Sequence, residues 1–152
     1  MSYTNCPLTH AVGLAGFNVP KILADLRDQI DFTNGLKLEG IFRISGCESE
    51  IVGLYDEYTR GCSISKWNSH NAASLMKRWF KSWAGSKLLG EIEPSEFQKN
   101  PYLDVEQYLT EPKLSIWRWL LQLLCDIYAH REYNMMSATN IGTFHDVRWL
   151  WL

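Results

Sequence analysis

The stretch from Leu114 to His130 constrains the fold most strongly, because Leu114–Tyr128 is the most apolar stretch of the 152-residue chain. Arg118, Gln122 and Asp126 interrupt this run every four residues, which places them on one face of a helix. A membrane-spanning helix would not carry such a polar stripe, so the pattern predicts an amphipathic helix buried against a core. The predicted core positions are Leu114, Trp117, Leu120, Leu121, Leu124 and Tyr128.

The same helical spacing of apolar residues recurs upstream. It predicts a helix over Val19–Ile30, a second from about Glu48 to Arg60, and a third from Ser69 to Trp83. The predicted core faces are Val19, Ile22, Leu23, Leu26 and Ile30 in the first, Ile51, Leu54, Tyr55 and Tyr58 in the second, and Ala72, Ala73, Met76, Trp79, Phe80 and Trp83 in the third.

Shorter pieces follow, and strand signals are missing. A helical piece is expected over Pro94–Phe97, a turn or two over Val105–Leu109, and a last helix capped by Ser137 that carries Asn140 and Ile141. No segment shows the alternation of apolar and polar residues that is typical of a strand. The sequence therefore predicts an all-α domain.

Length and composition agree with one domain that has a single core, since 46% of the residues are hydrophobic. The net charge of -2 gives no general attraction to nucleic acid or to an anionic membrane. Four scattered cysteines show no metal-ligand spacing, and reduced thiols are expected. Because the N-terminus also lacks the features of a secretory signal, a cytoplasmic location is predicted.

Arg43 is the only arginine in the otherwise apolar stretch from Gly40 to Gly46. A guanidinium in such a stretch either extends to water or is presented at a surface for a purpose. Most arginines are solvated or form local ion pairs, so taken alone the residue is compatible with a structural role.

Lys77 and Lys81 lie four residues apart and share one face of the third predicted helix. Two like charges at this spacing repel each other by only a few tenths of a kcal/mol, which a solvated face tolerates. The pair also suits an acidic or phosphate-bearing partner, and the spacing alone does not separate the two interpretations.

Motifs of intrinsic catalysis are missing from the sequence, which has no phosphate-binding glycine loop, zinc-protease motif or serine-nucleophile motif. The four histidines have no partner residue in a recognisable context. We expect a chain that binds no nucleotide, metal or cofactor of its own. The seven tryptophans are predicted to belong to the core rather than to a binding site.

Three blocks of this sequence, in order, resemble the RhoGAP domain, which activates Rho-family small GTPases. Leu38–Gly46 is very similar to the arginine-finger loop of that family, His70–Lys81 resembles its lysine-bearing helix, and Asn134–Gly142 resembles its asparagine block. Phe17–Pro20 looks like the family's opening. The resemblance implies a single helical bundle of the RhoGAP type.

The resemblance also implies a function in signal transduction. Arg43 matches the catalytic arginine that the family inserts in trans into a GTPase, which carries the GTP and the magnesium. Lys77, Lys81 and Asn140 match residues that bind the GTPase or support the finger loop. The expected activity is GTPase activation without an active site of the chain's own, and the expected partner is a Rho-family small GTPase.

The chain also departs from the family pattern. Lys81 stands where the family usually has arginine, 83–87 replace a proline-rich turn, and no Gly-Pro-Asn turn follows Phe144. We therefore divide the chain into an N-terminal segment 1–16, a RhoGAP-like domain 17–144 and a divergent apolar tail 145–152, with a shortened or altered C-terminus. The alternative is an inactive module that binds a small GTPase or another signalling partner. The target GTPase and the oligomeric state stay open.

Overall fold

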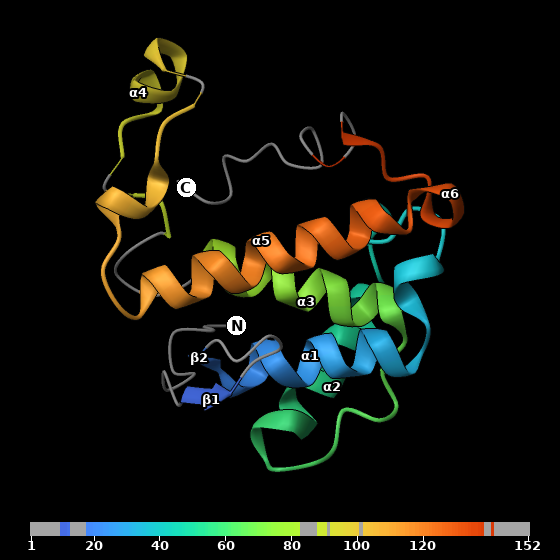
Figure 1. Cartoon of the computed structure of the whole chain (residues 1–152). Coiled ribbons are helices and arrows are strands. Elements are labelled where there is room, and N and C mark those ends of the chain that lie inside the picture. Colours follow the sequence, from blue (N-terminus) through green and yellow to red (C-terminus); the bar gives the residue numbers. More distant parts are fainter. Residues whose placement is uncertain are drawn as a thin grey trace.

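A computed structural model describes residues 10–12, 18–82, 88–90, 92–100, 102–138 and 141 of the chain. Helices dominate these residues, which confirms the predicted all-α class (Figure 1). In chain order the elements are β1 (His10–Val12), β2 (Asn18–Pro20), α1 (Lys21–Phe32), the 3₁₀ helix η3 (Gly35–Lys37), α2 (Glu48–Thr59), α3 (Ser69–Ser82), α4 (Pro94–Lys99), the 3₁₀ helix η4 (Val105–Tyr108), α5 (Lys113–Ala129) and α6 (Arg131–Asn134).

The predicted helices form with ends that shift by one or two residues, whereas η3 and α6 were not predicted. α3 begins after Asn68, whose Oδ1 accepts the N–H of Asn71 at 2.8 Å and so caps the first turn. The predicted helix after Ser137 lies mostly outside the described residues. Its first turn is visible in the hydrogen bond from the Ile141 N–H to the Ser137 carbonyl, at 2.8 Å.

A short antiparallel pair of strands corrects the expectation that the chain has none. β1 pairs with β2 so that Ala11 lies opposite Val19. Each strand has three residues, which is too short for alternation to become visible in the sequence. The pair lies beside the start of α1 (Figure 1) and does not change the fold class.

The core lies between α1, α3 and α5. All five predicted core residues of Val19–Ile30 are buried, and so are the predicted core residues of α3 up to Phe80. Trp67, Trp79 and Trp119 are 2% exposed and Trp117 packs against this core, which confirms the structural assignment of these four tryptophans. Trp83, Trp149 and Trp151 lie outside the described residues.

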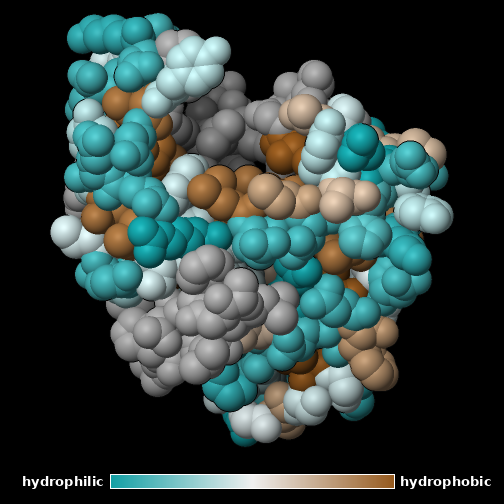
Figure 2. All heavy atoms as spheres, in the orientation of Figure 1, coloured by the Kyte–Doolittle hydropathy of each residue, from teal (hydrophilic) through white to brown (hydrophobic). Residues whose placement is uncertain are grey.

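The buried face of α5 differs in part from the predicted one. Of the six predicted core positions, Leu120 is fully buried and Leu114, Trp117 and Leu124 pack against the core as partly buried residues, while Leu121 is 38% and Tyr128 is 41% exposed. The fully buried apolar positions of the helix are Ile116, Trp119, Leu120, Leu123 and Ile127. α5 is apolar around most of its circumference, so the remaining apolar side chains form a band along its outer surface (Figure 2).

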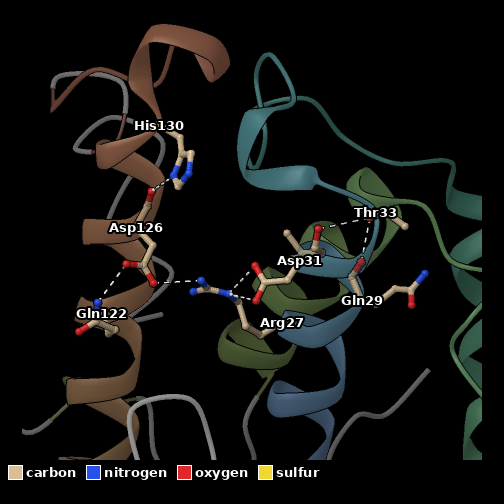
Figure 3. A network of polar contacts seen from close by, with 8 residues as sticks. Arg27, Gln29, Asp31, Thr33, Gln122, Asp126 and His130 are labelled. Atoms are coloured by element: carbon tan, nitrogen blue, oxygen red, sulfur yellow. Dashed lines mark hydrogen bonds and ion pairs between the residues drawn. The ribbon is translucent and has the colours of Figure 1, made fainter.

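Arg27 of α1 crosses the interface to α5 and is 5% exposed (Figure 3). Its Nη2 donates to Asp126 Oδ2 at 2.9 Å, and its Nε donates to Asp31 at 3.1 Å. Gln122 Nε2 donates to the other oxygen of Asp126 at 3.0 Å. Of the predicted polar stripe, Asp126 thus pairs with α1, while Gln122 is exposed and contacts Asp126 from the same helix. None of the described helices is long and apolar enough to cross a membrane.

Candidate functional site

Arg43 lies in an exposed turn that follows the buried residues Ile41 and Phe42. The turn belongs to the segment Leu38–Gly46, which we call the Arg43 loop. Ile41 is 0% exposed and Phe42 is 3% exposed, whereas the Arg43 side chain is exposed. The N–H groups of Arg43 and Ile44 both donate to the Gly40 carbonyl at 2.8 Å. Burial of the preceding side chains and this tight turn fix the backbone from which Arg43 projects.

α3 holds the Arg43 loop through hydrogen bonds to its backbone. Lys77 Nζ donates to the Phe42 carbonyl at 2.8 Å, which lies directly before Arg43. The Gly46 N–H donates to Ser74 Oγ at 2.8 Å, and the N–H of Cys47 donates to Asn71 Oδ1 at 2.8 Å. These three α3 residues lie along one face of the helix and bind the middle and the end of the loop.

Asn134 binds the beginning of the loop from the opposite side. Its backbone carbonyl accepts the Gly40 N–H at 2.8 Å. Its side chain is fully buried, and Nδ2 donates to the carbonyls of Leu36 and Ile127, each at 2.8 Å. The loop is therefore held at its beginning, at its middle and at its end.

The glycines at either end of the loop are required for different reasons. Gly40 has φ +73°, a left-handed conformation that a side chain disfavours, and a Cβ there would lie 2.6 Å from Ile44 Cδ1. Gly46 lets the loop pass close to α3, because a Cβ there would lie 2.8 Å from the Cα and 2.9 Å from the backbone N of Asn71. Both glycines set the shape of the turn that carries Arg43.

Positive charge accumulates on the surface beside the loop. Burial lowers the pKa of Lys77 below its ordinary value, and repulsion by Lys81 lowers it further. The Lys81 side chain is exposed, one turn farther along α3. Arg78, between them, forms an ion pair with Glu48 at the start of α2. The half-buried Lys77 ammonium is thus committed to the loop, while Lys81 lies at the surface.

A shallow apolar crevice, partly open to solvent, lies between the Arg43 loop, α3 and α5. Its wall includes Phe42, Phe80, Leu124 and the stem of Lys77, which accounts for the desolvation of that lysine. Among the described residues no cluster of histidine, cysteine, aspartate or glutamate could hold a metal ion. The chemistry that this region offers is a presented guanidinium.

The structure places Lys77 and Lys81 one turn apart on α3, as their spacing predicted, and Lys77 contacts the backbone directly before Arg43. Asn140 lies outside the described residues. Sequence reasoning missed the roles of Asn71, Ser74 and Asn134. Asn71, Ser74 and Lys77 recur at intervals of three, and this polar stripe beside the apolar face of α3 is a signal that could have identified the first two. Asn134 has no comparable signal, because the partners that link it to the loop, Leu36 and Gly40, lie far away in the sequence.

The sequence is similar to one known domain family and to several of its members. The model of the RhoGAP domain family matches residues 20–146. The chain is 31% identical over 131 residues to Rho GTPase-activating protein gacA of Dictyostelium discoideum, covering 84% of this chain and 38% of that protein. It is 29% identical over 131 residues to Rho GTPase-activating protein 2 of Arabidopsis thaliana, covering 84% of this chain and 30% of that protein.

A solved structure shares the fold. The chain is similar to the BH domain from Graf, the GTPase regulator associated with focal adhesion kinase, with a TM-score of 0.64 and 18% sequence identity. The superposition covers 81% of this chain and 74% of that one. The chain spans 38% or less of the length of the two curated relatives above.

Proposed function

Because the chain belongs to the RhoGAP domain family, we propose that it accelerates GTP hydrolysis by a Rho-family small GTPase and that Arg43 is the arginine it supplies. The observation that carries the proposal is the exposed Arg43 on a loop whose neighbouring residues are buried and hydrogen-bonded. A loop held in this way can insert a guanidinium into another protein with little loss of conformational entropy.

An inserted arginine stabilises the negative charge that develops during phosphoryl transfer. The GTPase supplies the nucleotide, the magnesium ion and the residue that orients the attacking water. An arginine supplied in trans accelerates hydrolysis by about 10³- to 10⁵-fold, or about 4 to 7 kcal/mol of activation free energy. The chain itself needs no nucleotide site for this function.

The other predicted site residues have supporting roles in the proposal. Lys77 fixes the Phe42 carbonyl and thereby the direction in which the next residue projects. Lys81 contributes an exposed charge to the GTPase interface, as a point charge rather than the planar fork of an arginine. Asn140 is assigned to the support of the loop by its match to the family's asparagine block.

Single-turnover GTP hydrolysis by a panel of Rho-family GTPases tests the proposal. Arg43→Ala should reduce the stimulated rate about 10³-fold or more, because the transition-state contact is lost, while much of the affinity for the GTP-loaded GTPase is kept. Arg60→Ala is the matched control, since Arg60 is also exposed but pairs with Asp56 at the end of α2. Its stimulation should equal that of the wild type.

Two other outcomes would contradict the proposal. Equal stimulation by the wild type and by Arg43→Ala would mean that another group accelerates hydrolysis. Binding to the GTP-loaded GTPase without any acceleration by the wild type would identify the chain as a non-catalytic binding module.

A further inference from the structure

Asn134 is fully buried and hydrogen-bonded through both its side chain and its backbone. The two Nδ2 hydrogens are donated to the carbonyls of Leu36 and Ile127, and Oδ1 accepts the Met136 N–H, each at 2.8 Å. Leu36 belongs to η3 and Ile127 to the last turns of α5. One amide group thus joins α5 to the chain segment directly before the Arg43 loop.

The backbone of Asn134 continues this connection into the loop itself. Its carbonyl accepts the Gly40 N–H at 2.8 Å, and the Gly40 carbonyl in turn accepts the N–H of Arg43 at 2.8 Å. Gly40 has φ +73°, so the peptide planes on either side of it define the turn. Two consecutive hydrogen bonds therefore lead from Asn134 to the backbone of Arg43.

We propose that Asn134 is a positioning residue that sets the direction of Arg43 by fixing the start of the Arg43 loop against α5. This inference rests on the proposed function of Arg43. The middle and the end of the loop are held by Lys77, Ser74 and Asn71 of α3. Without the contact to Asn134, the beginning of the loop can move relative to these fixed points.

A small displacement is enough to matter for catalysis. Moving a catalytic group by about 1 Å can cost about 10²-fold in rate, even when binding is kept. The proposal therefore predicts a selective loss of the contribution that Arg43 makes, and not a general loss of affinity for the GTPase.

Asn134→Asp is the sharpest substitution because it keeps the shape and the acceptor for Met136 but loses the amide donors. Gln29→Glu is the matched control. Gln29 is also a buried amide, and its Nε2 donates to the carbonyls of Trp67 at 2.7 Å and Ser65 at 3.3 Å, which supports the connection between α2 and α3 instead of the Arg43 loop. Asn134→Ser, which is uncharged and keeps one donor, replaces Asn134→Asp if the latter does not fold.

A double-mutant cycle with Arg43→Ala separates positioning from general destabilisation. Asn134→Asp should lower the saturating single-turnover rate about 10- to 100-fold, with affinity for the GTP-loaded GTPase changed less than about 3-fold. In the Arg43→Ala background it should change the rate less than about 2-fold, because the group it positions is absent. An equal loss in both backgrounds, or an equal loss in Gln29→Glu, would overturn the proposal.

Amide hydrogen exchange of the chain without any GTPase gives a readout that does not depend on activity. Asn134→Asp should speed exchange at Gly40 and Arg43 more than at Gly46, which is held by Ser74. Unchanged relative protection at Gly40 and Arg43 would overturn the inference even if hydrolysis were slower. If the wild type stimulates no GTPase, the proposed function fails, while faster exchange at these two amides still supports Asn134 as the group that fixes the loop.

Discussion

Helices α3 and α5 both carry a polar stripe beside an apolar face, but the two stripes bind different kinds of partner. On α3, Ser74 and Lys77 bind backbone groups of the Arg43 loop. On α5, Asp126 binds the side chain of Arg27, and Arg118 binds that of Glu106. A stripe of polar residues on an amphipathic helix therefore does not by itself indicate that this face of the helix is exposed to solvent.

The difference in partner has a consequence for rigidity. A backbone group has few ways to move without moving its chain, so the contacts from α3 fix a loop in space. The exposed Arg118 side chain can change rotamer at modest cost, and the buried Arg27 pairs with side chains rather than with a loop backbone, so the contacts of α5 stabilise packing without defining a loop. The Arg43 loop, which carries the candidate site, is therefore the segment that is held through its backbone.

The largest expected effect concerns which face of α5 is buried. Leu123→Ala should lower the free energy of unfolding by about 2 to 5 kcal/mol, because Leu123 is 1% exposed and its loss leaves a cavity. Leu121→Ala should cost less than about 1 kcal/mol, because Leu121 lies in the exposed band. Urea unfolding measures the free energy of unfolding of both variants. Equal losses of stability would contradict the assignment of Leu123 to the buried face of α5 and of Leu121 to the exposed band.

The buried face of α5 could not be predicted reliably from the sequence, whereas the buried face of α3 could. In α3, polar residues such as His70, Ser74 and Lys81 separate the apolar positions, so one face alone satisfies helical spacing. In α5, apolar residues such as Leu121 and Leu123 lie on different sides of the helix, so more than one face satisfies helical spacing. The band that stays exposed is a property of the tertiary packing, which a local pattern does not contain.

The second prediction concerns the close approach of the Arg43 loop to α3. Gly46→Ala should lower the free energy of unfolding by about 1 to 3 kcal/mol, because the added Cβ would meet the backbone of Asn71, which cannot move without α3. Gly53→Ala is the control: Gly53 lies within α2 with no atom near its Cβ position, so alanine should stabilise by about 0.5 to 1 kcal/mol. Thermal unfolding that shifts both variants alike would show that the loop does not pack on α3 this closely.

Arg27 and Arg118 provide the third prediction, on the side-chain contacts that α1 and η4 make with α5. Arg27→Met should lower the free energy of unfolding by about 1 to 2 kcal/mol, since its side chain is 7% exposed while its two carboxylate partners reach water. Arg118→Met should have a much smaller effect, because both members of the Arg118–Glu106 pair are exposed. Raising the salt concentration should reduce only the Arg118 effect, and a strong salt dependence at Arg27 would argue against its burial.

The candidate site combines features that are visible in the local sequence with contacts that only the fold creates. The local pattern marks Arg43 as a charge in an apolar stretch and Lys77 as one of two lysines on a helix face, but their roles were predicted from the resemblance to the RhoGAP family and not from spacing. The contacts of Asn134 with Leu36 and Gly40 join segments about a hundred residues apart, and no spacing rule reports them. The contacts of Asn71 and Ser74 with the end of the loop could not be predicted, because nothing local indicates that the loop returns to this face of α3.

The smallest expected effect compares a histidine of α3 with one at the end of α5. Burial lowers the pKa of His70 below its ordinary value of 6.5, and its buried Nδ1 has no hydrogen-bond partner among the described residues. The unfolded chain therefore binds a proton at a higher pH than the fold does, so the stability that neutral His70 provides is complete above pH 6.5 and falls as the pH decreases toward the lowered value. His70→Leu should flatten the loss of stability between about pH 7.5 and 5.5. His130→Gln, which removes the ring that contacts the Asp126 carbonyl, is the control. If His130→Gln flattened the dependence of stability on pH and His70→Leu did not, the pH-sensitive group would lie at the end of α5 instead of in α3.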